Sequence, residues 1–187
     1  MLNEREDMLR AAADFIGRRP NATQDEIARA LGVGRTTLHR HFTGRAELMK
    51  TLTDMAGEKL RQAIERARPT EGDCTAAVRR LVEATAESAP YVGLLYALTQ
   101  DDIETDPHPV WTEVDQAVVG LFERGQASGE FSTRMTAAWM AEAFYSLMAG
   151  ALWAVESGRC APRDFTHMVT HMLLSGVGNH GTDRQNT

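Results

Sequence analysis

With 187 residues, of which 43% are apolar, 25% charged and 6% aromatic, the chain can bury a core, and its two cysteines are too few for a disulfide scaffold. The net charge is −6, but residues 1–68 carry 13 Lys and Arg against 10 Asp and Glu, whereas residues 69–187 have a balance of −9. This composition excludes a low-complexity or collagen-like chain, and the basic N-terminal third indicates a part that meets a polyanion.

The first third of the chain predicts a series of helices separated by glycine and proline. Apolar residues recur at helical spacing at the start, and Pro20 ends the first helix. Thr23 and Glu26 have the spacing of a capping box, in which each side chain bonds to a free backbone amide at a helix start. The predicted helices span residues 3–18, 24–31, 35–42 and 45–67.

Beyond Pro69 the pattern stays helical, and no run of alternating β-branched residues supports a strand. Breaks are expected at Pro90, at the acidic segment 101–106, at 128–129 and at 158–161. We therefore expect an all-α fold of about nine helices, with a DNA-binding domain over 1–46 and a ligand-binding and dimerisation domain over 47–187. The later helices are predicted at 75–88, 91–99, 107–127, 136–156 and 162–175.

Residues 24–42 have the pattern of a helix-turn-helix. Ala28 permits a close contact between two short helices, and Gly32 permits the left-handed turn that joins them. The outer face of the second helix would carry only donors, hydroxyls and cations, which suit phosphates and base edges. A plain helical hairpin with a solvated polar face is the alternative, but such faces usually mix charges of both signs. The outer side chains are Arg35, Thr36, Thr37, His39, Arg40 and His41.

The segment TQDEIARALGVGRTTLHRHFTGRAELM, residues 23–49, resembles the N-terminal domain of the TetR family of transcriptional regulators. The resemblance implies that Arg35, Thr36 and Thr37 face the major groove. It also implies that phosphates are contacted by Thr23, His39, His41 and Arg45. In the family, position 39 is usually tyrosine and position 45 usually lysine; both replacements keep a donor, and His39 adds a group that titrates near neutral pH.

The helix predicted at 136–156 is apolar on every side, so it must be covered on every side. The domain's own helices can cover one side, and a second chain would cover the other. The helix at 162–175 has its own apolar stripe. We expect a homodimer formed through these last two helices, which would present two recognition helices to a palindromic operator.

Aromatic residues and methionines of the C-terminal part are candidates for lining a cavity for an apolar or aromatic effector. The alternative is that they simply fill the core. Glu142, the one carboxylate in the apolar helix, has three interpretations: a ligand anchor, a core acid or an interface residue. The candidate ligand-binding residues are Tyr91, Leu95, Tyr96, Trp111, Met140, Glu142, Phe144 and Met148, with Phe122 beside them.

No nucleophile–base, phosphate-loop or dinucleotide pattern is present, so we expect no enzymatic activity and no cofactor. His167 and His171 are four residues apart, but exposed histidines are a better interpretation than a metal site. The apolar stretch 137–155 favours a buried helix over a membrane span. The sequence predicts a cytoplasmic, ligand-responsive repressor; the alternative is an all-helical small-molecule binding protein without specific operator binding.

Overall fold

The computed structural model describes residues 4–101 and 109–178, and over that part the chain is helical with one isolated β-bridge between Phe131 and Gly178. This confirms the all-α prediction. In chain order the helices are α1 (Glu4–Arg18), α2 (Gln24–Ala30), α3 (Arg35–His41), α4 (Arg45–Ala67), α5 (Cys74–Ala86), α6 (Ala89–Asp101), α7 (Pro109–Ala127), α8 (Ala137–Glu156), the 3-10 turn η1 (Pro162–Asp164) and α9 (Phe165–Val177).

The predicted helices agree with the structure to within a few residues, and the largest differences involve prolines. Pro90 was expected to separate two helices, but it lies in the first turn of α6. A proline is tolerated there because the first-turn amides have no partner within the helix. Pro162 opens η1, so α9 begins at Phe165. The expected break at 101–106 lies, beyond Asp101, outside the described residues.

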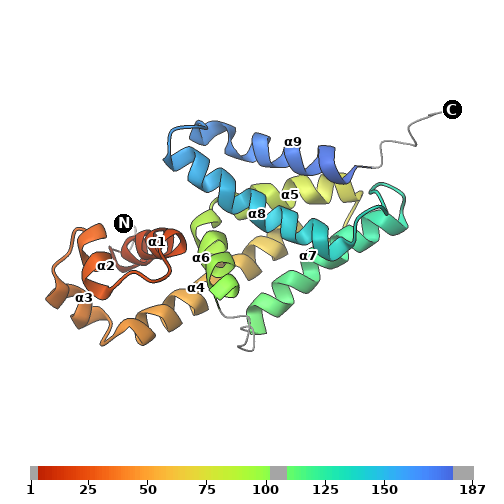
Figure 1. Ribbon diagram of the computed structural model, residues 1–187. Helices are drawn as coiled ribbons and strands as arrows, with labels where there is room; N and C mark the ends of the chain where they lie inside the picture. Colours follow the sequence, from red (N-terminus) through yellow and green to blue (C-terminus); the bar gives the residue numbers. More distant parts are fainter. Residues whose placement is uncertain (1–3, 102–108, 179–187) are drawn as a thin grey trace.

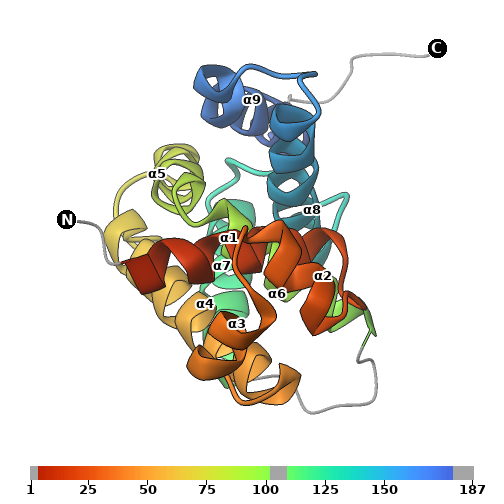
Figure 2. The same ribbon diagram turned by 90° about the vertical axis from the view of Figure 1, so that its left-hand side faces the viewer.

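Helices α1 to α3 form a head at one end of the molecule, and the long α4 leads from it into a body made of α5 to α9 (Figure 1). Within the body, α8 packs against α6, α7 and α9. Helix α9 lies on the side farthest from α4, and α3 lies at the outer end of the head (Figures 1 and 2). Helix α3 therefore lies on the side of the head that points away from the body.

The head contacts the body through α1 as well as through α4, because α1 packs along α6. At Gly17 the two backbones are so close that a Cβ atom would lie 3.0 Å from the backbone nitrogen of Leu94 and 3.2 Å from the carbonyl carbon of Gly93. Any larger residue would push the two backbones apart by a few tenths of an ångström. The predicted domain boundary at residue 46 thus assigns α1 and α6 to different domains, although these two helices pack on each other.

We expect Gly17→Ala to destabilise the protein by about 1–3 kcal/mol, since the added methyl group meets backbone atoms that cannot rotate away. Gly120→Ala is the matched control, because a Cβ at this other helical glycine meets nothing within 4 Å. It should stabilise by about 0.5–1 kcal/mol. Urea unfolding monitored by circular dichroism measures both; equal effects of the two substitutions would contradict the close approach of α1 and α6.

Candidate nucleic-acid interface and effector cavities

Helix α3 presents a face of donors and hydroxyls to solvent. Leu38 is its only buried residue, and Thr37 is partly buried. The other side chains of the helix are exposed, and none of them is a carboxylate. Five of the residues that were predicted to contact DNA are therefore exposed to solvent: Arg35, Thr36, His39, Arg40 and His41.

The turn between α2 and α3 is fixed by local interactions. The Thr23 hydroxyl accepts a hydrogen bond from the amide of Glu26 at 3.3 Å, and the Glu26 carboxylate accepts one from the amide of Thr23 at 2.8 Å. The hydrogen bonds that its carboxylate accepts from the amide and the hydroxyl of Thr23 lower the pKa of Glu26. Gly32 has φ 67°, and the amide of Val33 bonds to the carbonyl of Ala28 at 3.0 Å. The predicted capping box is present, so the angle between α2 and α3 is set by the sequence itself.

A core beneath α3 holds it against α1 and α4. Leu38 and Phe42 are 1% exposed, and Leu48 at the start of α4 is fully buried. The Arg5 guanidinium of α1 lies 5.7 Å from the centre of the Phe42 ring. Because these apolar side chains are anchored from three helices, the outer face of α3 has a defined direction.

Arg35 has a partner that the sequence pattern did not reveal. Its guanidinium lies 3.3 Å from the carboxylate of Asp25, on α2. The side chains are 75% and 54% exposed, so water screens the pair and it contributes little to stability. Arg35 can therefore exchange Asp25 for another acceptor at small cost.

Two of the predicted phosphate contacts have protein partners in this structure. The Arg45 guanidinium donates hydrogen bonds to the carbonyls of Pro20 and Ala22. The Thr23 hydroxyl is held by Glu26, to which it also donates at 2.8 Å. Arg45 thus fixes the loop before α2 to the start of α4, a role that the local sequence pattern could not show because the partners are carbonyls of another segment.

A groove of about 600 Å³ runs beside α3, between α1 and the helix-turn-helix. Both polar and apolar side chains line it. Three of the lining residues, Thr37, Arg40 and His41, are among those predicted to contact DNA. The lining residues are Arg5, Asp7, Met8, Ala11, Leu31, Val33, Thr37, Arg40 and His41.

Most candidate ligand-binding residues lie in the body, and most of them are buried. The Tyr91 hydroxyl bonds to the sulfur of Met55 at 3.2 Å, and the half-buried Tyr96 bonds to Ser146 at 2.9 Å. Trp111 is partly buried and packs on Tyr145, with the two ring centres 4.8 Å apart. The residues with at most 5% of their surface exposed are Tyr91, Leu95, Met140, Phe144 and Met148.

Glu142 does not join this group. Its side chain is on the exposed face of α8, which also carries Trp139 and Ser146, so it does not line an interior cavity. Of its three interpretations, the position on a solvent-facing apolar helix favours an interface residue. A buried polar group that the sequence pattern did not single out is Tyr145. It is 2% exposed, and its hydroxyl donates to Asp115 at 3.3 Å. Burial and the Asp115 carboxylate both raise the pKa of Tyr145.

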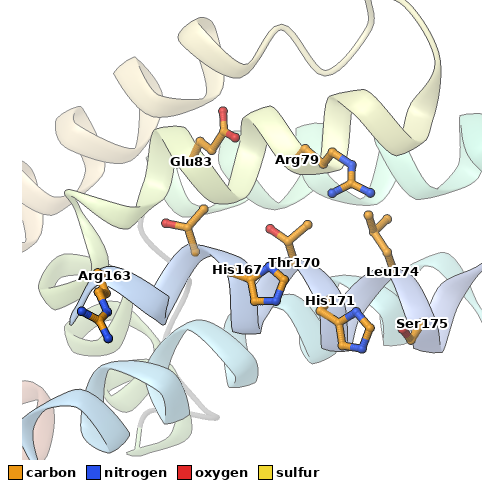
Figure 3. Close-up of a pocket in the computed structure, with 9 residues that line it drawn as sticks. Arg79, Glu83, Arg163, His167, Thr170, His171, Leu174 and Ser175 are labelled. Carbon is orange, nitrogen blue, oxygen red and sulfur yellow. The ribbon is translucent and has the colours of Figure 1, made fainter. Parts of the chain in front are cut away.

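The described residues enclose hollows within the body and at its contact with the head. A groove of about 660 Å³ separates α5 from α9 and is lined by Arg79 and Glu83 on one side and by His167, Thr170 and His171 on the other (Figure 3). A smaller cavity of about 110 Å³ lies between α1, α6 and α8. Tyr96 lines this second cavity, and the other candidate ligand-binding residues line neither of the two.

The outer faces of α8 and α9 carry large apolar side chains that the protein's own helices leave uncovered. Trp139 is 62% exposed, and Trp153 is 47% exposed with the Arg159 guanidinium stacked 4.3 Å from its ring centre. On α9, Met168 and Met172 are 48% and 58% exposed. Exposed apolar clusters of this kind mark interaction surfaces. No helix within residues 4–101 or 109–178 is both long and apolar enough to cross a bilayer.

Known proteins match this architecture along nearly the whole chain. Residues 9–52 match the family described as "Bacterial regulatory proteins, tetR family". The chain is 32% identical to the HTH-type transcriptional regulator NfxB of Pseudomonas aeruginosa, over 96% of this chain and 97% of the relative. It is 33% identical to the HTH-type transcriptional repressor LfrR of Mycolicibacterium smegmatis, over 92% of this chain and 87% of the relative.

Solved structures give the same result. The crystal structure of the TetR-like regulator LfrR from Mycobacterium smegmatis aligns with a TM-score of 0.69 at 29% identity, covering 92% of this chain and 95% of that chain. The structure of LfrR in complex with proflavine aligns with a TM-score of 0.63 at 31% identity and the same coverage. Head and body are therefore arranged as in these regulators.

Proposed function

The chain belongs to the TetR family of DNA-binding transcriptional regulators, which are not enzymes, and from this premise we propose that it is a ligand-responsive repressor that binds a palindromic operator as a homodimer. The observation that carries the proposal is the outward face of α3, which is free of carboxylates in a chain of net charge −6. Such a regulator acts on DNA in the bacterial cytoplasm.

In the proposed complex, α3 enters the major groove. Arg35 leaves Asp25 and directs its planar guanidinium to a guanine edge, because two parallel donors fit the O6 and N7 acceptors. Thr36 and Thr37 lie on the same turn and reach neighbouring bases. His39, Arg40 and His41 contact phosphates. Thr23 and Arg45 support α3 indirectly, since Thr23 caps the start of α2 and Arg45 binds the loop before α2 to the start of α4.

The proposed dimer buries the exposed apolar faces of α8 and α9 against a second copy. These faces belong to two helices that pack on each other, and their exposed large apolar side chains are Trp139, Trp153, Met168 and Met172. A symmetric pair doubles the reading surface, since one recognition helix meets only a few base pairs. In that arrangement Glu142 lies within or beside the interface.

The proposed effector is a planar aromatic molecule that binds in the body and shifts the separation of the two heads. LfrR, with which this chain shares its fold and a third of its residues, has been crystallised with proflavine. In this chain the candidate site is the aromatic interior around Tyr96, Trp111 and Phe144, which would open to admit a ligand. Because α6 carries α1, a change around Tyr96 reaches the head directly.

Titration against the DNA upstream of the chain's own gene tests operator binding. We expect a complex with the upstream duplex that is at least about 1,000-fold tighter than that with an unrelated duplex of equal length. Both complexes should weaken steeply with added salt, because phosphate contacts release counterions. Equal, micromolar binding to both duplexes would instead support a small-molecule binding protein without operator specificity.

Proflavine is the probe for the effector. Added to the preformed operator complex, it should lower the affinity for the upstream duplex by about 5- to 150-fold, the range that allosteric coupling commonly spans. Its binding to the free protein is followed by its own fluorescence. A protein that binds proflavine and keeps its full operator affinity would contradict the proposed coupling.

A further inference from the structure

Three helices that belong to the head and the body meet at the small cavity of about 110 Å³. From α1 it is lined by Asp14, Gly17 and Arg18, and from the end of α8 by Glu156. Helix α6 closes it beside the close approach at Gly17. The cavity is therefore a junction at which the last turns of α1 and α8 come together.

The junction holds two carboxyl groups and one guanidinium. Arg18 pairs with Asp14, one turn earlier on α1, and its Nε lies 3.2 Å from the Glu156 carboxylate. One guanidinium does not fully compensate two neighbouring carboxylates whose side chains are 24% and 25% exposed, because water screens them only in part. Asp14 Oδ1 is buried without a hydrogen-bond partner among the described residues. A proton on Glu156 removes one charge and supplies the donor that this oxygen lacks.

We propose that Glu156 is a positioning residue that, when protonated, holds the last turn of α1 against the end of α8, so that the placement of the DNA-binding head depends on a proton at this junction. When the proton leaves, Asp14 and Glu156 repel each other across the cavity and α1 is released from α8. The consequence for DNA rests on the proposed function, whereas the junction itself does not.

The charged and titratable groups around Glu156 come from α1, α6 and the segment after α8. Helix α1 contributes Asp14 and Arg18, and α6 contributes the Tyr96 hydroxyl, which is bonded to Ser146. After α8, Arg159 is engaged on the face of Trp153. Among the described residues, no other charged side chain lines the cavity.

The pKa of Glu156 is shifted in the direction that this arrangement of charges predicts. Burial, and then the neighbouring Asp14, raise the pKa of Glu156 from 4.5 to about 7, and Arg18 opposes the shift only in part. Because the folded state holds the proton more tightly than the unfolded chain, the contribution of the protonated contact to stability is fully present below about pH 4.5. Its contribution to stability then falls as the pH rises to about 7, and the contact opens above that value.

Trp153 lines the same cavity and serves as a local reporter. In a background with Trp111→Phe and Trp139→Phe, its fluorescence should change with a midpoint near pH 7. Glu156→Gln, which keeps the shape and cannot ionise, should abolish this transition, and Asp14→Asn should move the midpoint down by about one unit or more. His167→Gln/His171→Gln is the control for other groups that titrate near neutrality, and should leave the transition unchanged.

A transition that persists in Glu156→Gln, or a midpoint near 4.5 in the unsubstituted junction, would overturn the proposal. These measurements need no DNA, so they stand or fall separately from operator binding. A second measurement follows operator affinity between pH 6 and pH 8 in a His39→Gln/His41→Gln background, which removes both imidazoles from the DNA face. We expect a change of about fivefold that disappears in Glu156→Gln; an identical pH profile in both would show that the junction does not position the head.

Discussion

Met168→Glu/Met172→Glu is expected to be a folded monomer whose operator affinity is at least about 100-fold weaker than that of the unsubstituted protein. Both methionines are about half exposed on the outer face of α9. In the proposed dimer each glutamate would be taken out of water without a partner, which is costly. Loss of the second subunit removes the linked second binding event, commonly worth a factor of 10²–10⁴. Sedimentation velocity and operator titration measure the two effects.

His167→Glu/His171→Glu is the matched control. It places the same two charges at the same spacing on the same helix, but on the side that lines the groove toward α5. It should remain dimeric and bind the operator normally. If the methionine variant also stayed dimeric at micromolar concentration, the outer face of α8 and α9 would not be the interface.

Arg35→Ala is expected to weaken operator binding by about 5- to 150-fold for each half-site, corresponding to the loss of about 1–3 kcal/mol of base recognition there. The fold should be unchanged, because the side chain is 75% exposed and its ion pair with Asp25 is screened. Binding to unrelated DNA should fall much less. The difference between the two affinities, measured by titration of labelled duplexes, separates base reading from general attraction to phosphates.

Arg134→Ala removes the same charge from an exposed site on the loop between α7 and α8, far along the chain from the head. It should leave operator affinity and discrimination intact. A loss in Arg35→Ala that is equal for operator and unrelated DNA would assign Arg35 to the phosphate backbone and contradict its predicted place in the major groove.

The parts of this molecule that short-range interactions determine could be predicted from the sequence. The capping pair Thr23 and Glu26 and the left-handed turn at Gly32 define the start and the end of α2. Leu38 and Phe42 recur at helical spacing, so the buried and exposed sides of α3 follow. The identification of a helix-turn-helix needed only these residues.

The interactions that escaped prediction join segments distant in sequence or depend on backbone atoms. Arg45 binds carbonyl oxygens before α2, and Asp25 pairs with Arg35 across the turn. The junction of Asp14 with Glu156 joins α1 to the end of α8, which are far apart in the sequence. Hydrophobic periodicity also left open which side of α8 is covered, and the structure shows that Glu142 is on the uncovered side. The homodimer and the assigned DNA contacts remain predictions.

Selection of bound duplexes from a random pool tests the central claim most directly, because it examines specificity, symmetry and spacing together. The account predicts enrichment of a palindrome whose two half-sites have centres about one helical turn, roughly 10 base pairs, or a multiple of it apart. A pool that is not enriched, or that yields a single unrepeated element, would show that two copies of α3 do not read DNA as a symmetric pair.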